Sequence, residues 1–220
     1  MPTLFSYTIP IDDGAAPNPF YGYCTLAICK PRIRSSAQVG DWVAGLGSTN
    51  APSGNLAGRL VYAMRVEEVL TLKSYDEKAR AGSIQRIPDV KSSFLPDRLG
   101  DCIYDFSTGE PKQRPSVHGP GNQSTDVAGR NVLMSRDFYY FGKNAVELPQ
   151  NLHPIIHQQQ GHRSQSNNQF VERFIDWIRG SEFESGQVYG WPDFTVDWKR
   201  VGDCGVCEPR KIDGENDVPC

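Results

Sequence analysis

The run Gly-Arg-Leu-Val-Tyr-Ala-Met-Arg-Val at positions 58–66 is the strongest strand signal in this chain and restricts the folds open to it. A second apolar run, Trp-Val-Ala-Gly-Leu at positions 42–46, follows a Gly40-Asp41 turn. The segment between the two runs, at positions 49–57, is rich in Gly, Pro, Ser and Asn. Two strands joined in this way form a hairpin with a long tip, so we expect a core built on a β-sheet.

Further strand signals precede a single strong helix signal. Strands are expected at positions 4–11, 21–28, 102–104 and 131–135, and a capping box formed by Ser74 and Glu77 predicts a short helix. Phe170, Phe174, Trp177 and Ile178 share one helical face, and Gly180 is a suitable C-cap. This order predicts an α+β fold with a small, strongly curved β-sheet or open barrel on which the helices pack.

The length of 220 residues fits one domain, which we place at residues 1–190, followed by an acidic, cysteine-bearing extension at 191–220. Residues 193–220 carry 7 acidic and 4 basic side chains. The net charge of −3 excludes a strongly basic nucleic-acid-binding protein. Lys30, Arg32 and Arg34 alternate, so on a strand they would form a local basic patch or a charged edge that prevents aggregation.

The N-terminal residues lack a charged segment followed by an apolar core, and no apolar run approaches the ~18 residues of a membrane span. We therefore expect a cytoplasmic protein whose cysteines are reduced or metal-bound. Residues 81–130 are irregular and rich in Pro, Gly, Ser and Asp. This segment is interpreted as a functional loop or as a family-specific insertion.

Two short stretches resemble the PUA-type barrels, a class that includes the EVE, ASCH and YTH domains. They are Gly-Asp-Trp-Val at positions 40–43 and Ala-Met-Arg-Val-Glu at positions 63–67. The resemblance implies a PUA-like barrel.

A longer set of motifs is similar to the nucleotide-modification-associated domain family, type 2. The motifs lie at positions 18–48, 58–64, 100–118 and 132–142, and the similarity covers roughly residues 5–180. It implies a bacterial or phage protein that is encoded beside enzymes modifying or restricting DNA and that binds a nucleotide or modified base. It implies no catalytic residue, and Cys102 stands where a polar residue such as Asn is expected.

His118 is the candidate catalytic residue. It lies in the Ser-Val-His-Gly stretch at positions 116–119, and an imidazole can serve there as acid, base or base-edge hydrogen bonder. The alternative is a loop histidine with a structural role. His153 and His157 have the spacing of a metal-binding pair, but Pro154 disfavours a helix, so we expect a surface loop.

The cysteines offer two kinds of chemistry. Cys204 and Cys207 form a CxxC pair, which supplies half of a zinc site, although a disordered tail is the favoured interpretation and no cofactor is predicted. Cys24 and Cys29 lie in an apolar stretch, where either thiol could pair with His118 as a nucleophile. The alternative for both is a buried, inert cysteine.

The remaining candidates are side chains suited to stack on a base and to read its edge. For any single aromatic residue among them, a place in the core is the alternative. The predicted ligand-binding set is Asn18, Trp42, Ser48, Arg59, Tyr104, Ser116, His118, Ser135, Tyr139 and Tyr140.

Three functions remain open. The first is recognition of a nucleotide or modified base, which predicts a cage of aromatic side chains. The second is an enzyme that modifies a base or nucleotide, which predicts that His118 lies within hydrogen-bond reach of Ser116, Cys24 or Cys29 in one pocket. The third is a non-catalytic interaction subunit that presents the helix at positions 168–179. DNA-modification enzymes are the expected partners.

Overall fold

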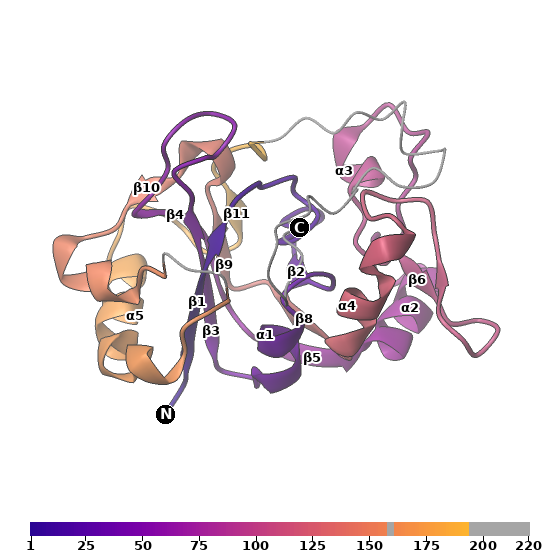
Figure 1. The fold of residues 1–220 in the computed structure, drawn as a ribbon, viewed down its shortest axis with the longest axis horizontal. Helices are drawn as coiled ribbons and strands as arrows, with labels where there is room; N and C mark the ends of the chain where they lie inside the picture. Colours follow the sequence, from indigo (N-terminus) through magenta and orange to yellow (C-terminus); the bar gives the residue numbers. More distant parts are fainter. Residues whose placement is uncertain (158–160, 194–220) are drawn as a thin grey trace.

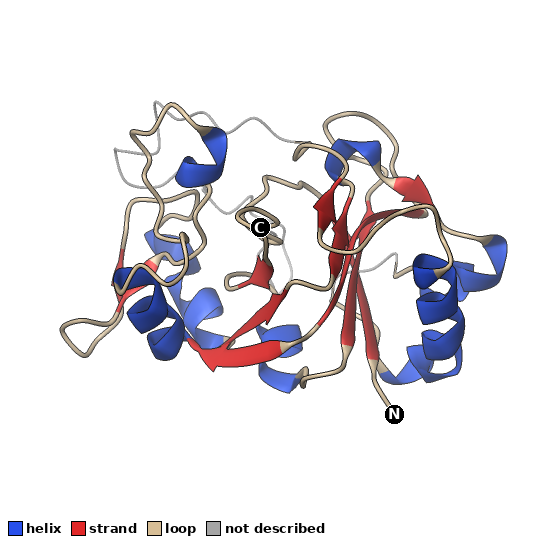
Figure 2. Ribbon diagram, turned by 180° about the vertical axis from the view of Figure 1, so that it is seen from behind, coloured by secondary structure: helices blue, strands red, loops and turns tan. Residues whose placement is uncertain are grey.

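The computed structural model describes residues 1–157 and 161–193. These residues form an α+β fold with a six-stranded, a three-stranded and a two-stranded sheet. Figure 1 shows the six-stranded sheet nearly edge-on, with helices on either side of it. Seen from behind in Figure 2, helices lie at both ends of the molecule and the strands run between them. The α+β prediction is confirmed.

The six-stranded sheet is built around the predicted hairpin. Strand β3 (Trp42–Gly47) pairs antiparallel with β4 (Arg59–Arg65), which confirms it. On the other side β3 pairs in parallel with β1 (Leu4–Ile9). Strand β4 also pairs with β9 (Phe138–Tyr140) and β10 (Val146–Glu147), and β9 pairs in parallel with β11 (Gln187–Val188).

Both faces of this sheet are buried, which explains why β3 is apolar throughout rather than alternating. Leu4 and Trp42 belong to the core on one face, whereas Phe5 and Tyr7 belong to the core on the other. Successive side chains of a strand point to opposite faces, so β1 contributes to both cores. The sheet is therefore a partition between two apolar layers.

The first layer is covered by α5 (Val171–Arg179), whose Phe174 and Ile178 are buried against the sheet. The predicted helix at positions 168–179 is confirmed over α5, and Gly180 is its C-cap. The residues before it form the 3-10 helix η4 (Gln165–Phe170). In Figure 1 this helical layer is the orange part of the chain beside the sheet.

The second layer carries the three-stranded antiparallel sheet, with β8 (Asn131–Ser135) between β2 (Cys24–Leu26) and β5 (Glu68–Thr71). Helix α2 (Leu72–Arg80) packs on β5. The prediction of Ser74 as the N-cap is wrong, because the helix begins about one turn earlier. Thr71 is the N-cap, and its hydroxyl accepts a hydrogen bond from Ser74 N at 3.0 Å.

Lys30, Arg32 and Arg34 do not lie on a strand, so the basic patch or charged edge that a strand would have given them does not form. Pro31 opens helix α1 (Pro31–Ser36), because proline has no N–H to lose at the first helical position. Arg34 turns inward and is fully buried, so Lys30, Arg32 and Arg34 do not share a basic face.

The other elements of the described chain are short. The irregular segment between α2 and β8 holds most of them. They are α3 (Leu95–Arg98), β6 (Tyr104–Asp105), β7 (Lys112–Gln113), η1 (Pro120–Asn122), α4 (Gln123–Ala128), η2 (Gly142–Asn144) and η3 (Gln150–Ile155).

Within the described residues no sheet closes into a barrel, so kinship with PUA-type barrels stays a prediction. The start of the expected extension contacts the body, since Lys143 N donates to Trp191 O at 3.0 Å. Cys204 and Cys207 lie outside the described residues. Among the helices that are described, none has the length and apolar character needed to cross a lipid bilayer.

Candidate functional site

The turn between β2 and α1 holds Cys29 in an unusual backbone conformation. Cys29 has φ 57° and Lys30 has φ 40°, so two consecutive non-glycine residues lie in the left-handed region. Such residues cost about 1–3 kcal/mol each and concentrate at functional sites. The chain leaves β2 at Leu26 and enters α1 at Pro31, so the connection between them is four residues long. A cysteine on a tight strand-to-helix turn resembles the arrangement that presents nucleophiles in other enzymes.

Arg34 fixes this turn from within α1. Its guanidinium donates to the carbonyls of Cys29 and Ala27, each at 2.7 Å, and to that of Asn131 at 2.9 Å. It also donates to the carbonyl of Asp126. Burial lowers the pKa of Arg34 from its ordinary value, and the nearby Asp126 opposes that shift. A buried cation thus ties the Cys29 turn to the helix that carries Asp126.

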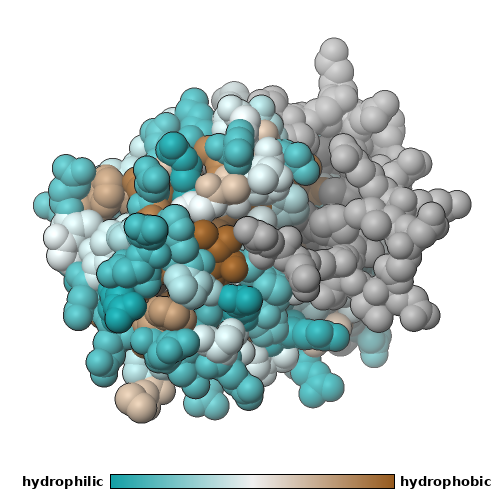
Figure 3. Space-filling view, turned by 60° about the vertical axis from the view of Figure 1, so that its left-hand side comes forward, coloured by the Kyte–Doolittle hydropathy of each residue, from teal (hydrophilic) through white to brown (hydrophobic). Residues whose placement is uncertain are grey.

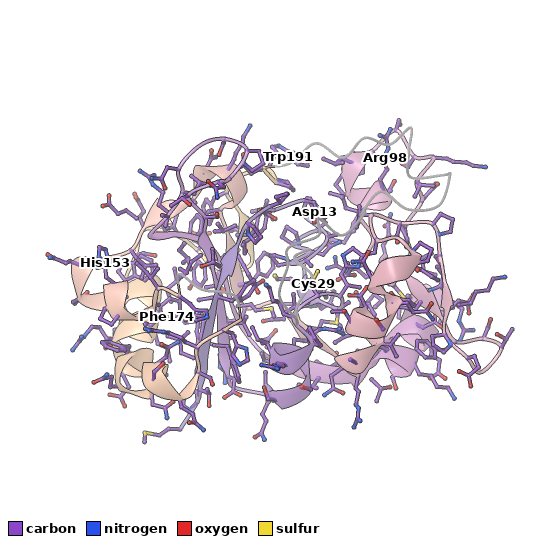
Figure 4. All side chains as sticks on the ribbon, viewed as in Figure 1. Asp13, Cys29, Arg98, His153, Phe174 and Trp191 are labelled. Carbon is purple, nitrogen blue, oxygen red and sulfur yellow. The ribbon has the colours of Figure 1, made fainter. Side chains whose placement is uncertain are left out.

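Cys29, His118 and Asp126 form a continuous hydrogen-bonded row. Cys29 Sγ lies 3.5 Å from His118 Nε2, and His118 Nδ1 lies 2.6 Å from Asp126 Oδ2. The backbone N–H of Cys29 donates to Asp126 Oδ1 at 2.9 Å, and the hydroxyl of Tyr104 donates to Asp126 Oδ2 at 2.9 Å. All four side chains are buried. In Figure 4 Cys29 lies near the middle of the molecule, on the opposite side of the six-stranded sheet from Phe174.

The protonation of this row follows from Asp126. Burial raises its pKa, but the hydrogen bond and charge of His118, the N–H of Cys29 and the charge of Arg34 outweigh burial and lower it. Asp126 is therefore an ionised acceptor, and the proton of the imidazole must lie on Nδ1. When the ring carries this one proton, Nε2 is an acceptor that faces the Cys29 thiol. The arrangement can remove a proton from that thiol.

The same three residues could also hold a metal ion, since their ligand atoms all lie within 4.8 Å of one another. The hydrogen bonding argues for proton transfer instead. Cys29 and Asp126 approach opposite nitrogens of the His118 ring, and one ion can bind only one of them. The Asp126 carboxylate already accepts hydrogen bonds from Cys29, Tyr104 and His118. A metal would have to displace these contacts.

The other two described thiols differ in environment from Cys29. Burial raises the pKa of Cys24 far above its ordinary range, and burial raises the pKa of Cys102 to about 12. A thiol in such surroundings is a poor nucleophile because the thiolate is the reactive form. Of the cysteines weighed from the sequence, Cys29 is the one placed against His118.

Three of the predicted ligand-binding residues meet at this site. They are Tyr104, His118 and Ser116, whose hydroxyl donates to the carbonyl of His118 at 3.3 Å. Asn18 belongs to the same sequence motif as Cys29, but its buried side chain has structural partners. It donates to the Leu99 carbonyl at 2.7 Å and accepts from Arg86.

The structure does not bring the other predicted residues to this site. Trp42 and Tyr139 pack in the core on the α5 side of the sheet, and Tyr140 donates to Asp12 at 2.7 Å. The hydroxyl of Ser135 donates to the carbonyl of Asp137 at 3.1 Å, while Ser48 and Arg59 contact neighbouring loop backbone. His153 is exposed as expected, but it lies in the 3-10 helix η3 and not in a loop. Binding roles for these residues stay predictions.

Two members of the site were missed from the sequence. Asp126 lies in α4, inside the irregular segment, where no local motif distinguishes it from other acidic residues. Arg34 was read as a surface charge because its alternation with Lys30 and Arg32 suggested a strand. Pro31 was the available signal for a helix, and a helix would have separated these three side chains.

The family model for nucleotide modification associated domain 2 matches residues 1–200. The chain belongs to this family. The match includes the Cys29 turn, His118 and Asp126, and it confirms the resemblance seen in the motifs. A role in nucleotide modification systems is thereby indicated for this family member. No curated protein and no solved structure gives a significant match to the chain.

Proposed function

We propose that this member of the family is a thiol-dependent enzyme of a nucleotide modification system, with Cys29 as nucleophile and His118 as general base. The observation that carries the proposal is the 3.5 Å contact between Cys29 Sγ and His118 Nε2, behind which Asp126 orients the ring at 2.6 Å. A nucleophile, a base and a third group that orients the base are the parts required for covalent catalysis.

The chemistry that these groups support is transfer or hydrolysis at a carbonyl carbon. His118 Nε2 takes the proton of the Cys29 thiol, and the sulfur bonds to the carbon as the C=O π pair moves onto oxygen. When that pair returns, the bond from carbon to the leaving nitrogen or oxygen breaks, and Nε2 gives its proton to the leaving group. Water then attacks the thioester with His118 again as base, and the Cys29 sulfur leaves and regains its proton. The substrate class is an acyl or amide group carried by a nucleotide or base.

The geometry supports this proposal better than pure base recognition at the same site. A recognition site needs aromatic faces, and Trp42 and Tyr139 pack instead in the core beneath α5. A nucleophile–base pair is the feature that separates the two hypotheses, and Cys29 with His118 provides one. The 3.5 Å contact between Cys29 and His118 supports the enzyme hypothesis.

The interaction-subunit hypothesis has less support. It depended on the helix at positions 168–179, but α5 packs its apolar residues Val171, Phe174 and Ile178 against the sheet. On the face shown in Figure 3, hydrophilic residues cover most of the described surface and hydrophobic residues form small patches. A large docking face is expected to show a broader apolar area.

The proposal is tested with p-nitrophenyl acetate, an activated ester that reports acyl transfer to a thiol. We expect a burst of p-nitrophenol from the native chain and none attributable to this site from Cys29→Ala. His118→Gln and Asp126→Asn should slow the burst by about 100-fold or more, because each removes a part of the proton transfer.

Cys102→Ala is the matched control, since Cys102 is also buried but has its pKa raised to about 12. It should retain the burst. A Cys29→Ala chain that is folded by circular dichroism and still gives the full burst would exclude Cys29 as the nucleophile.

A further inference from the structure

A hollow of about 540 Å³ is lined in part by Phe20, which packs in the same apolar cluster as Cys29. Its wall comes from three parts of the chain: the turn at positions 19–22, the segment around Phe94, and residues 186–191 with the neighbouring Lys143 and Asn144. We call it the aromatic hollow. Its volume lies within the range of small-molecule sites.

All three aromatic side chains that are exposed in the described part of the chain line the aromatic hollow. Tyr21, Phe94 and Trp191 expose 36%, 53% and 50% of their surface, respectively. Burial of an aromatic ring is strongly favourable, so exposed rings gathered in one concavity indicate a surface that a ligand covers. If the three rings were exposed for unrelated reasons, they would be scattered over the surface of the molecule.

The rings are held in place by their surroundings. Trp191 is fixed through its backbone, because its carbonyl accepts from Lys143 N at 3.0 Å, and its ring lies 6.0 Å from that of Phe20. Tyr21 is fixed at its far end by a hydrogen bond from its hydroxyl to Asp97. Rings that are already ordered lose little conformational freedom on binding.

Polar side chains also line the aromatic hollow. The Asn144 side chain donates from Nδ2 to the Tyr189 carbonyl at 2.9 Å, which orients its amide, and Gln187 adds a second amide. Lys143 supplies a positive charge that is exposed to solvent. Flat apolar faces, amides and one cation are the groups that match a base and its phosphate.

We propose that the aromatic hollow binds the base of a nucleotide by stacking, with Lys143 at its phosphate. The inference rests on the proposed function in one respect: the bound nucleotide is the part of the substrate that carries the group attacked by Cys29. Phe20 connects the two regions, since it lines the hollow and packs in the same apolar cluster as Cys29 and Tyr104. In Figure 4 Trp191 and Cys29 lie toward the same side of the six-stranded sheet.

Isothermal titration calorimetry of the full chain tests this inference. The probes are the four common 2′-deoxynucleoside 5′-monophosphates, with 2-deoxyribose 5-phosphate as the probe that lacks a base. We expect at least one nucleotide to bind about tenfold or more tightly than the sugar phosphate, because stacking contributes to affinity. Trp191→Ala and Phe94→Ala should each weaken that binding about tenfold, whereas Phe94→Tyr should retain it.

Ile87→Ala is the matched control, because Ile87 is an apolar side chain of comparable exposure, 38%, that does not line the hollow. It should bind like the native chain. Nucleotides that bind no better than the sugar phosphate, or folded Trp191→Ala and Phe94→Ala chains with native affinity, would overturn the inference.

The two proposals fail separately. The burst and the nucleotide binding are each measured on the native chain, and Ile87→Ala should keep both. If folded Cys29→Ala still gives the full burst while the native chain binds nucleotide, only the enzyme proposal is overturned. If the burst depends on Cys29 but the native chain binds no nucleotide, only the proposal that the aromatic hollow binds a base is overturned.

Discussion

At the scale of single residues, environment decides what each cysteine can do. Burial raises the pKa of Cys24 and of Cys102, whereas Cys29 contacts the imidazole of His118 and donates its backbone N–H to Asp126. The reactive form of a thiol is the thiolate, so these contacts distinguish one candidate nucleophile from two inert side chains.

Asp12 is a second buried acid with an unusual titration. Its carboxylate accepts from the Tyr140 hydroxyl at 2.7 Å and from the backbone N–H of Gly14 at 3.2 Å. Burial nevertheless raises the pKa of Asp12 from 3.8 to about 7, and these two hydrogen bonds oppose that rise only in part. The folded protein therefore keeps a proton on Asp12 at pH values where the unfolded chain has lost it.

This difference predicts how stability depends on pH. Between pH 4 and pH 7 the folded state binds the extra proton, so the contribution of Asp12 to the free energy of unfolding falls as pH rises, by up to about 1.4 kcal/mol per pH unit. Asp12→Asn removes the titration and keeps an oxygen acceptor for Tyr140. Urea unfolding of both proteins at pH 4.5 and 6.5 should show a steeper fall for the native chain. Parallel pH dependence would contradict the assignment of this pKa.

At the scale of elements, the turn from β2 to α1 depends on close contact between α1 and the end of α4. Arg34 in α1 holds the carbonyls of Cys29 and Asp126, and Gly129 at the end of α4 lies directly against its guanidinium. A Cβ atom on Gly129 would come within 2.3 Å of Arg34 Cζ. The space that Gly129 leaves therefore allows the buried guanidinium to reach the turn.

Gly129→Ala should displace this guanidinium and disturb the Cys29 turn. We expect a loss of about 1–3 kcal/mol in the free energy of unfolding, as for other overpacked sites, together with a weaker ester burst. Gly121→Ala is the control, because a Cβ there meets no atom within 4 Å and should leave both quantities unchanged. Urea unfolding and the burst assay measure the two effects. A Gly129→Ala chain that matches Gly121→Ala in both would show that Arg34 does not support the site.

At the scale of the whole molecule, the six-stranded sheet separates the site from the helical layer formed with α5. Trp42 packs edge-on against Phe174 with ring centroids 5.8 Å apart on one side, while Tyr7 and Phe5 face the other side. The helical layer contributes apolar burial, and the opposite layer contains Cys29, His118 and Asp126. The proposed catalytic residues therefore lie on the side of the sheet that faces away from α5.

This division predicts that damage to the α5 layer lowers stability without removing the chemistry. Phe174→Ala creates a cavity at a fully buried position and should cost about 3–5 kcal/mol of unfolding free energy. At a temperature where the variant is still folded by circular dichroism, its Cys29-dependent burst should equal that of the native chain. A folded variant that has lost the burst would show that the two faces are coupled.

Local patterns in the sequence predicted much of the fold. The hairpin of β3 and β4, the strand β1, the helix α5 and its C-cap Gly180 all come from periodicity or turn residues that act within a few positions. Strand β5 was missed, and the N-cap of α2 was misplaced from Thr71 to Ser74. Both errors lie where strand and helix are continuous in the chain, so no turn residue separates them.

The sequence by itself determined the α+β class, the family, and the choice of His118 with a cysteine as possible catalytic partners. The tertiary structure decided which cysteine lies against His118. Cys29 lies 89 positions from His118 and 97 from Asp126 in the sequence, so their contacts leave no local pattern. It also decided that Arg34 is buried and that Tyr21, Phe94 and Trp191 share one hollow. Periodicity reports which face of an element is apolar, whereas a site depends on which distant elements meet, and packing of the whole chain fixes that.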